Sequence, residues 1–329
     1  NQEASMLNDP FGRKIDYLRL SVTDRCDFRC FYCLPKSHRG FETPDDWLTP
    51  AETERLVAQF AALGVRHVRL TGGEPLVRKE LTDIASRIAA LPGIEELSLS
   101  TNASRLDQYA EPLSQAGVTR LNISLDSLDE NKFKQITGSR LQPVLAGIEA
   151  AGATGLSPIK INMVVMRGLN DDEVEKMVDY CLAHNLTLRF IETMPVGEGG
   201  QAAAERYIPL TEIEARLRRR YKLQAAAMQG SGPARYFQVD DSGLVIGFIT
   251  PQSQHFCETC NRVRVSVSGD LHLCLGQEDK LALRPLLRQG ASDETLQQAI
   301  RSAIARKPER HHFNETPTAI IRPMSALGG

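Results

Sequence analysis

Six of the seven cysteines fall into two short groups whose spacing is typical of ligands for metal ions or metal clusters. The first group has the spacing C-x3-C-x2-C and the second has C-x2-C-x13-C. Together they comprise Cys26, Cys30, Cys33, Cys257, Cys260 and Cys274. The seventh, Cys181, stands in an apolar run and is predicted to be a small buried residue. In a reducing cytoplasm, grouped cysteines indicate metal binding and not disulfides.

The first group suits an iron–sulfur cluster better than zinc. Structural zinc normally takes four protein ligands, whereas this loop supplies three thiols and has His38 as the nearest further candidate. Three cysteines around a four-iron cluster leave one iron open to another molecule. The spacing therefore favours an open cluster over a partial zinc knuckle.

The second group leaves both interpretations open. C-x2-C is one half of a zinc knuckle, and His255 or His272 could supply the fourth ligand. On spacing alone, zinc competes seriously with a second cluster.

Several basic residues stand on or beside predicted strands, within or next to apolar runs. They are Arg19, Arg69, Lys160, Arg262 and Arg264. A single arginine in such a run is more often a paired edge residue, but five of them indicate anion binding. Because Arg262 and Arg264 alternate with Val263 and Val265, both should point to one face, just after Cys260.

The elements that position these groups alternate between strands and helices. Strands are expected at 17–22, 67–70, 96–100, 120–125, 159–165 and 188–192. Thr49, Pro50 and Glu52 form a capping signal ahead of the first helix. Six such units fall short of the eight of a closed barrel. The sequence therefore predicts an α/β fold, an incomplete (β/α)6 TIM-type barrel with a C-terminal α+β extension.

The chain divides into four predicted segments. These are a flexible N-terminus at 1–14, the partial barrel at 15–195, an extension with the second cysteine group at 196–310, and a tail at 311–329. Within the extension, 196–205 is expected to be a mobile loop, and hairpins are expected at 234–250 and 262–275.

Composition and charge exclude several classes of protein. The formal net charge of −2 gives no general attraction to nucleic acid or to an anionic membrane. No apolar stretch is long enough to span a bilayer, and residues 1–20 lack the apolar segment of a signal peptide. We therefore expect a cytoplasmic protein.

The motif C-x3-C-x-aromatic-C, with Tyr32 as the aromatic residue, resembles the signature of the radical S-adenosylmethionine (SAM) superfamily. The segment TGGEP at 71–75 is similar to the methionine-binding segment of that family. The resemblance implies a [4Fe-4S] cluster on Cys26, Cys30 and Cys33 whose open iron binds SAM. It implies further cofactor contacts by Tyr32, Gly73, Ser124 and Met194.

Separate motifs resemble the GTP 3′,8-cyclase family of molybdenum cofactor biosynthesis. They are YLRLSVTDRC, RLTGGEP, NISLDSLD, RFIE, FCETCNRVRVSVSGDLHLCL and a terminal Gly-Gly. This resemblance implies a second [4Fe-4S] cluster on Cys257, Cys260 and Cys274 that faces the substrate. It also implies GTP contacts by Arg19, Arg69, Thr101, Lys160, Arg262, Val263 and Arg264. The family usually has Gly where this chain has Ala103, which restricts the local loop geometry.

The same resemblance implies a reaction and partners. A 5′-deoxyadenosyl radical abstracts the C3′ hydrogen of GTP, and the carbon radical then attacks C8 of the guanine. The first cysteine triad, Arg262 and Arg264 would be catalytic, and the Gly-Gly tail would enter the site. An external electron donor and a downstream cyclic pyranopterin monophosphate synthase are expected as partners; the sequence leaves the oligomeric state open, with a homodimer as one candidate. The alternatives are a radical enzyme acting on a peptide or RNA, and a zinc-stabilised scaffold.

Overall fold

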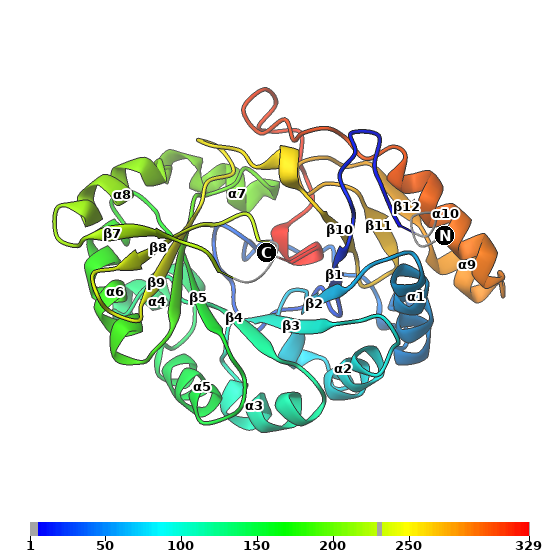
Figure 1. Ribbon diagram of the computed structural model, residues 1–329, viewed down its shortest axis with the longest axis horizontal. Helices are drawn as coiled ribbons and strands as arrows, with labels where there is room; N and C mark the ends of the chain where they lie inside the picture. Colours follow the sequence, from blue (N-terminus) through cyan, green and yellow to red (C-terminus); the bar gives the residue numbers. More distant parts are fainter. Residues whose placement is uncertain (1–5, 229–231, 329) are drawn as a thin grey trace.

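The computed structural model describes residues 6–228 and 232–328. Six parallel strands with helices between them form the centre of a curved sheet (Figure 1). The strands are β1 (Tyr17–Ser21), β2 (His67–Thr71), β3 (Glu96–Thr101), β4 (Arg120–Ser124), β5 (Ile159–Val164) and β6 (Thr187–Ile191). The predicted incomplete barrel is therefore confirmed, with all six strands in the expected positions.

Helices cover the outer face of the sheet (Figure 1). They are α1 (Pro50–Ala62), α2 (Leu81–Ala89), α3 (Leu106–Gln115), α4 (Glu130–Thr137), α5 (Gln142–Gly152) and α6 (Val174–Ala183). The predicted capping box is present, because the Thr49 side chain accepts from the Glu52 amide and Glu52 accepts from the Thr49 amide. Short 3-10 turns lie at η2 (Pro44–Asp46), η3 (Pro75–Val77) and η4 (Asp171–Glu173).

The C-terminal extension continues the barrel sheet at both of its edges. Its strands are β7 (Leu223–Ala226), β8 (Arg235–Val239), β9 (Val245–Ile249), β10 (Arg262–Val265), β11 (Asp270–His272) and β12 (Lys280–Ala282). Strand β10 pairs in parallel with β1, and β9 pairs in parallel with β6. Beyond them, β11 and β12 extend one edge and β8 and β7 the other, all antiparallel. The two expected hairpins are thus confirmed.

The prediction of a mobile loop at 196–205 is wrong, because α7 (Gly197–Ala203) and η5 (Ala204–Arg206) occupy this segment. The remaining helices are α8 (Leu210–Arg218), η6 (Cys257–Thr259), α9 (Arg284–Arg288), α10 (Asp293–Ile304) and η7 (Met324–Ala326). Glycines allow α7 to pack against the cysteine loop, because a Cβ on Gly199 would lie 2.7 Å from the Phe31 carbonyl oxygen. The glycine-rich composition of this segment suggested a loop, but in the structure the glycines allow two backbones to pack closely.

The described part of the N-terminal segment, residues 6–14, is folded against the body of the chain. Leu7 is buried and its amide donates to the Leu63 carbonyl, while Ile15 donates to the Leu7 carbonyl. Arg13 pairs with Asp9 and donates to the Cys257 carbonyl oxygen at 2.7 Å. The segment expected to be flexible therefore supports the second cysteine loop, whereas residues 1–5 lie outside the described residues.

Among the described residues, none of the helices has the length and apolar character that a membrane crossing requires.

Candidate active site

Two adjoining cavities lie inside the curve of the sheet, the first at the carboxyl ends of the parallel strands and the second nearer their amino ends. The first cavity is lined by Cys26, Cys30 and Cys33, and the second by Cys257, Cys260 and Cys274. Asn162, Ile191 and Met194 line both cavities, so the two cysteine triads face neighbouring spaces. This arrangement follows from the fold, because β1 and β10 are paired although some 240 residues separate them.

The cysteines of the first triad are half-buried beside carboxylates. Burial, together with the nearby Asp126, raises the pKa of Cys33 to about 12. Burial also raises the pKa of Cys26, and Glu74 adds to the effect. Three thiols that line one cavity in such surroundings stay protonated unless a cationic group binds them. Their position and number therefore fit a metal cluster held by three thiolates.

The glycines of TGGEP are required for packing against the cysteine loop. A Cβ on Gly73 would lie 2.1 Å from the Arg25 carbonyl oxygen, and one on Gly72 would lie 2.3 Å from that of Thr23. The amide of Gly73 donates to Thr23, and that of Glu74 donates to Arg25. The two glycines therefore have a structural role in addition to the cofactor contact expected of Gly73. They first bring β2 and the loop together, and Gly73 then lines the first cavity.

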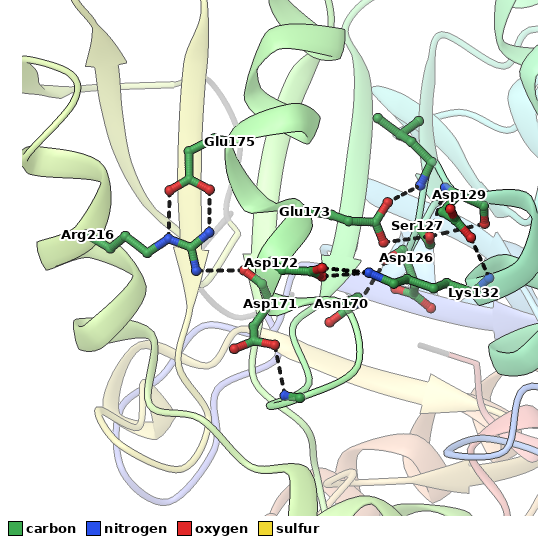
Figure 2. Close-up of polar contacts among 12 residues, drawn as sticks. Asp126, Ser127, Asp129, Lys132, Asn170, Asp171, Asp172, Glu173, Glu175 and Arg216 are labelled. Atoms are coloured by element: carbon green, nitrogen blue, oxygen red, sulfur yellow. Dashed lines mark hydrogen bonds and ion pairs between the residues drawn. The ribbon is translucent and has the colours of Figure 1, made fainter.

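A buried carboxylate that the sequence analysis missed holds Tyr32. The Tyr32 hydroxyl donates to Asp126 Oδ2 at 2.5 Å, and the Val164 amide donates to Oδ1 at 2.9 Å. The Asn170 side chain donates to the Asp126 carbonyl oxygen, and Glu173 accepts from the next residue, Ser127 (Figure 2). Burial raises the pKa of Asp126 to about 6. This network ties the cysteine loop to the ends of β4 and β5.

The predicted substrate residue Thr101 lies apart from the basic residues. It lines the first cavity, and its hydroxyl donates to Glu74 at 2.6 Å. Glu74 also accepts from the Asn102 amide at 2.6 Å, and burial raises its pKa to about 7. Ala103 has a φ of 64°, in the left-handed region that favours glycine, which agrees with the restriction expected from the sequence.

Strand register brings the predicted arginines into one row in the second cavity. Arg19 on β1 pairs in register with Arg264 on β10 and with Arg69 on β2. Because neighbouring strands at the same register point their side chains to the same face, these three side chains lie side by side. Lys160, Arg262 and Val263 line the same cavity. The structure thus brings together every predicted substrate residue except Thr101.

The second cavity holds much more positive than negative charge. Its one carboxylate in the described lining, Glu96, already pairs with Arg120. Burial and the neighbouring arginines lower the pKa of Arg19 well below its usual value, and that of Arg264 to about 9. Burial and Arg189 lower the pKa of Lys160 to about 7. Such mutual repulsion is relieved by a polyanion, so the cavity fits a triphosphate.

Two residues of this cavity escaped the sequence analysis. Arg189 is buried on β6 and donates to Asn162 Oδ1 and Asn122 Oδ1, both at 2.8 Å. Its position in an apolar run, like that of Arg19, was the available signal. Tyr17 lies between two guanidinium groups, with Arg69 at 5.4 Å and Arg262 at 5.1 Å from its ring centroid. An aromatic face attracts cations and holds them in place.

The second triad is surrounded by cations. Burial raises the pKa of the Cys260 thiol, but Lys307, Arg262 and Arg13 outweigh burial and lower it overall. Lys307 is buried, lines the cavity and donates to the Leu273 carbonyl oxygen at 2.6 Å. The lining in the described residues includes His311 but neither of the histidines proposed as zinc ligands. Three thiols with neither His255 nor His272 at the cavity fit a cluster better than the zinc knuckle that these histidines would complete.

The C-terminal tail reaches both sites. Met324 lines the first cavity. A backbone hydrogen bond from Ser325 to the Cys33 thiol acts to lower the pKa of Cys33, against the effect of burial. Arg264 donates to the Gly328 carbonyl oxygen at 2.7 Å, and a Cβ on Gly328 would lie 2.0 Å from Thr71 Oγ1. Figure 1 shows this end of the chain in the middle of the curved sheet. Gly329, the last residue of the predicted Gly-Gly tail, lies outside the described residues.

Comparisons with known proteins agree with this geometry. Residues 20–181 match the family model described as Radical SAM superfamily, and residues 186–313 match Molybdenum Cofactor Synthesis C. A GTP 3′,8-cyclase of Hydrogenovibrio crunogenus is 49% identical over 98% of this chain and 99% of its own length. A GTP 3′,8-cyclase of Paracoccus denitrificans is 47% identical over 98% of this chain and 96% of its own.

Among solved structures, Streptococcus suis SuiB bound to S-adenosylmethionine superposes with a TM-score of 0.63. The alignment covers 95% of this chain and 77% of that chain at 16% identity. At this level of identity the likeness concerns the fold alone.

Proposed function

Because this chain belongs to the GTP 3′,8-cyclase family of the radical SAM superfamily, we propose that it converts GTP to (8S)-3′,8-cyclo-7,8-dihydroguanosine 5′-triphosphate. This conversion is an early step of molybdenum cofactor biosynthesis. One observation supports it above all: a cavity with three thiols adjoins a cavity with three more thiols and a row of arginines.

The two triads would hold the cofactors. Cys26, Cys30 and Cys33 would bind a [4Fe-4S] cluster and thereby SAM, and the second triad would bind a second [4Fe-4S] cluster beside the substrate. When bound, the reduced first cluster and SAM supply the radical that takes the C3′ hydrogen of GTP.

The residues of the chain bind, orient and enclose the reactants. Arg19, Arg69 and Arg264 would bind the triphosphate, with Lys160 and Arg262 completing the positive cavity. Gly73, Ser124 and Met194 line the space for SAM, beside Tyr32 on its Asp126 support. Holding the two reactants in adjoining cavities makes hydrogen transfer effectively unimolecular. Thr101, whose hydroxyl donates to Glu74, is proposed to contact the substrate from the first cavity.

The remaining expectations are proposals of the same kind. They are an external electron donor, a cyclic pyranopterin monophosphate synthase as the next enzyme, a homodimer, a cytoplasmic location and the four-segment division of the chain.

The experiment measures 5′-deoxyadenosine formation from SAM by anaerobically reconstituted, dithionite-reduced protein, with GTP, ATP or no nucleotide. Strong stimulation by GTP alone, together with the cyclised product, is expected. Stimulation by a peptide or RNA and not by GTP would favour the alternative radical enzyme. Zinc without labile sulfide, and no SAM cleavage, would refute the radical function.

A further inference from the structure

The cysteine loop of the first triad separates two cavities. Phe28, Cys30 and Tyr32 line the first cavity, whereas Arg29 and Phe31 line an outer cavity on the other side. Alternate residues of one backbone segment therefore face the cofactor side and the outside. A protein bound at the outer cavity would therefore contact the loop that carries the first triad without entering the active site.

The rest of the outer cavity is built from the loop and two helices. Pro35 and Lys36 continue the loop side, Lys134, Gln135 and Gly138 come from the end of α4, and Glu198, Gly199 and Ala202 come from α7. The backbone of the loop is fixed on both sides. The Phe31 amide donates to the Ile136 carbonyl oxygen, and α7 packs on Phe31 through Gly199. The surface is thus preformed and suited to docking without rearrangement.

Basic side chains line this cavity and continue beyond it to form the basic patch. Arg29, Lys36 and Lys134 line the cavity, and the patch is completed by Arg25 and Arg39 next to them. The patch is continuous, because Arg25 and Arg29 both lie over the Phe41 ring, at 5.4 and 5.6 Å, and Arg39 donates to the Lys36 carbonyl oxygen.

Within residues 6–228 and 232–328, no cation of the basic patch forms an ion pair with a carboxylate. Arg29 donates to the carbonyl oxygens of Cys26 and Phe28 instead. Elsewhere on the surface, arginines such as Arg87 and Arg288 do pair with glutamates. Glu198 is the one carboxylate in the described lining of the outer cavity. A chain with a net charge of −2 therefore presents unpaired positive charge beside its first cysteine loop.

We propose that the basic patch is the docking surface for an acidic one-electron donor protein that reduces the cluster of the first triad. The inference rests on the proposed function, in which this cluster gains one electron and the donor loses one. Complementary charge accelerates the encounter and orients the partners, and electron-transfer encounters need only a small interface. The cationic side chains on the outer side of the cysteine loop supply the charge that complements an acidic protein.

The test reverses the charge of two exposed patch lysines, Lys36→Glu and Lys134→Glu together. The matched control is Lys176→Glu with Lys222→Glu, which changes the charge equally at exposed positions on α6 and before β7. The rate of 5′-deoxyadenosine formation is measured in the reconstituted proteins with limiting reduced flavodoxin, an acidic flavin protein, and separately with excess dithionite.

With flavodoxin, the patch variant should be at least about tenfold slower than the control variant, and the difference should shrink as salt is added. With dithionite the two variants should agree within about twofold. Equal rates with flavodoxin would overturn the docking site, as would an equal loss with both reductants, because that loss would show damage to the cluster. If the unaltered protein fails to cleave SAM even with dithionite, the proposed function is refuted, which is a separate result.

Discussion

The two cysteine triads have the same ligands but opposite electrostatic surroundings. Around the first, Glu74 and Asp126 add to burial and raise the pKa values of the thiols. Around the second, Lys307 and Arg262 outweigh burial and lower the pKa of Cys260, and Lys307 also opposes burial at Cys274, although burial still raises the pKa values of Cys257 and Cys274. The difference lies in the neighbours of the thiols and not in the cysteines themselves, because Glu74 and Asp126 follow β2 and β4, whereas Lys307 follows α10 and Arg262 begins β10.

This contrast matches the charges of the two proposed ligands. SAM carries a sulfonium and an ammonium against one carboxylate, so its net charge is positive and suits the first cavity. GTP carries a triphosphate and suits the second. We therefore propose that charge directs the cofactor and the substrate to different cavities.

The largest expected effect comes from removing a member of the arginine row. Arg264→Met deletes a buried cation at the centre of the second cavity, and hydrogen bonds to charged groups contribute about 1.5–3 kcal/mol each. GTP affinity, measured by equilibrium dialysis, should fall by roughly 10- to 150-fold, with SAM affinity unchanged. The exposed control Arg219→Met should leave both affinities unaltered. An equal loss of SAM affinity in Arg264→Met would mean that the positive charge of the second cavity also governs binding in the first cavity.

A second change tests the first cavity through α7. Gly199→Ala places a methyl group 2.7 Å from the Phe31 carbonyl oxygen and must displace the cysteine loop or the helix. Overpacking of this kind costs about 1–3 kcal/mol. We expect a lower unfolding midpoint and weaker SAM binding, with GTP binding retained. Gly152→Ala is the matched control, because nothing lies within 4 Å of its Cβ position. Identical behaviour of the two variants would show that α7 does not fix the loop.

The third prediction concerns pH. The pKa of Lys160 is lowered from 10.5 to about 7 in the free protein, so this side chain loses its proton as pH rises through 7. A bound triphosphate favours the charged form and raises the pKa. GTP affinity should therefore fall about tenfold between pH 6 and pH 8, with proton uptake on binding near neutral pH. Calorimetry in buffers of different ionisation enthalpy measures that uptake. Lys160→Arg, which stays charged, should abolish the uptake; uptake that persists in this variant would assign it to another group.

The smallest effect is expected at Ala103. Replacement by glycine relieves the left-handed backbone by about 1–2 kcal/mol, but it adds roughly 0.5–1 kcal/mol of unfolded-state entropy and removes a buried methyl worth about 0.8 kcal/mol. Chemical denaturation of Ala103→Gly should thus give a free energy of unfolding within about 1 kcal/mol of the original. A larger stabilisation would show that the strain at Ala103 is greater than its φ suggests.

Local patterns in the sequence predicted much of this architecture. Each barrel strand is a short apolar run, and the Thr49 cap and both cysteine groups are signals within a few residues. The register that places Arg19 on β1 opposite Arg264 on β10 could not be predicted, because no local signal encodes contact between segments so far apart. The helix α7 was missed because its glycines serve contacts with distant backbone. Asp126 was missed because its role depends on where Tyr32 lies.

The division of labour between the triads can be tested directly by electron paramagnetic resonance of the reduced clusters. Cys260→Ser should retain only the first cluster, and Cys30→Ser only the second. Adding SAM should change the spectrum of Cys260→Ser and leave that of Cys30→Ser unchanged, whereas GTP should do the reverse. A spectrum of Cys30→Ser that responds to SAM and not to GTP would contradict the assignment of cofactor and substrate to the two cavities.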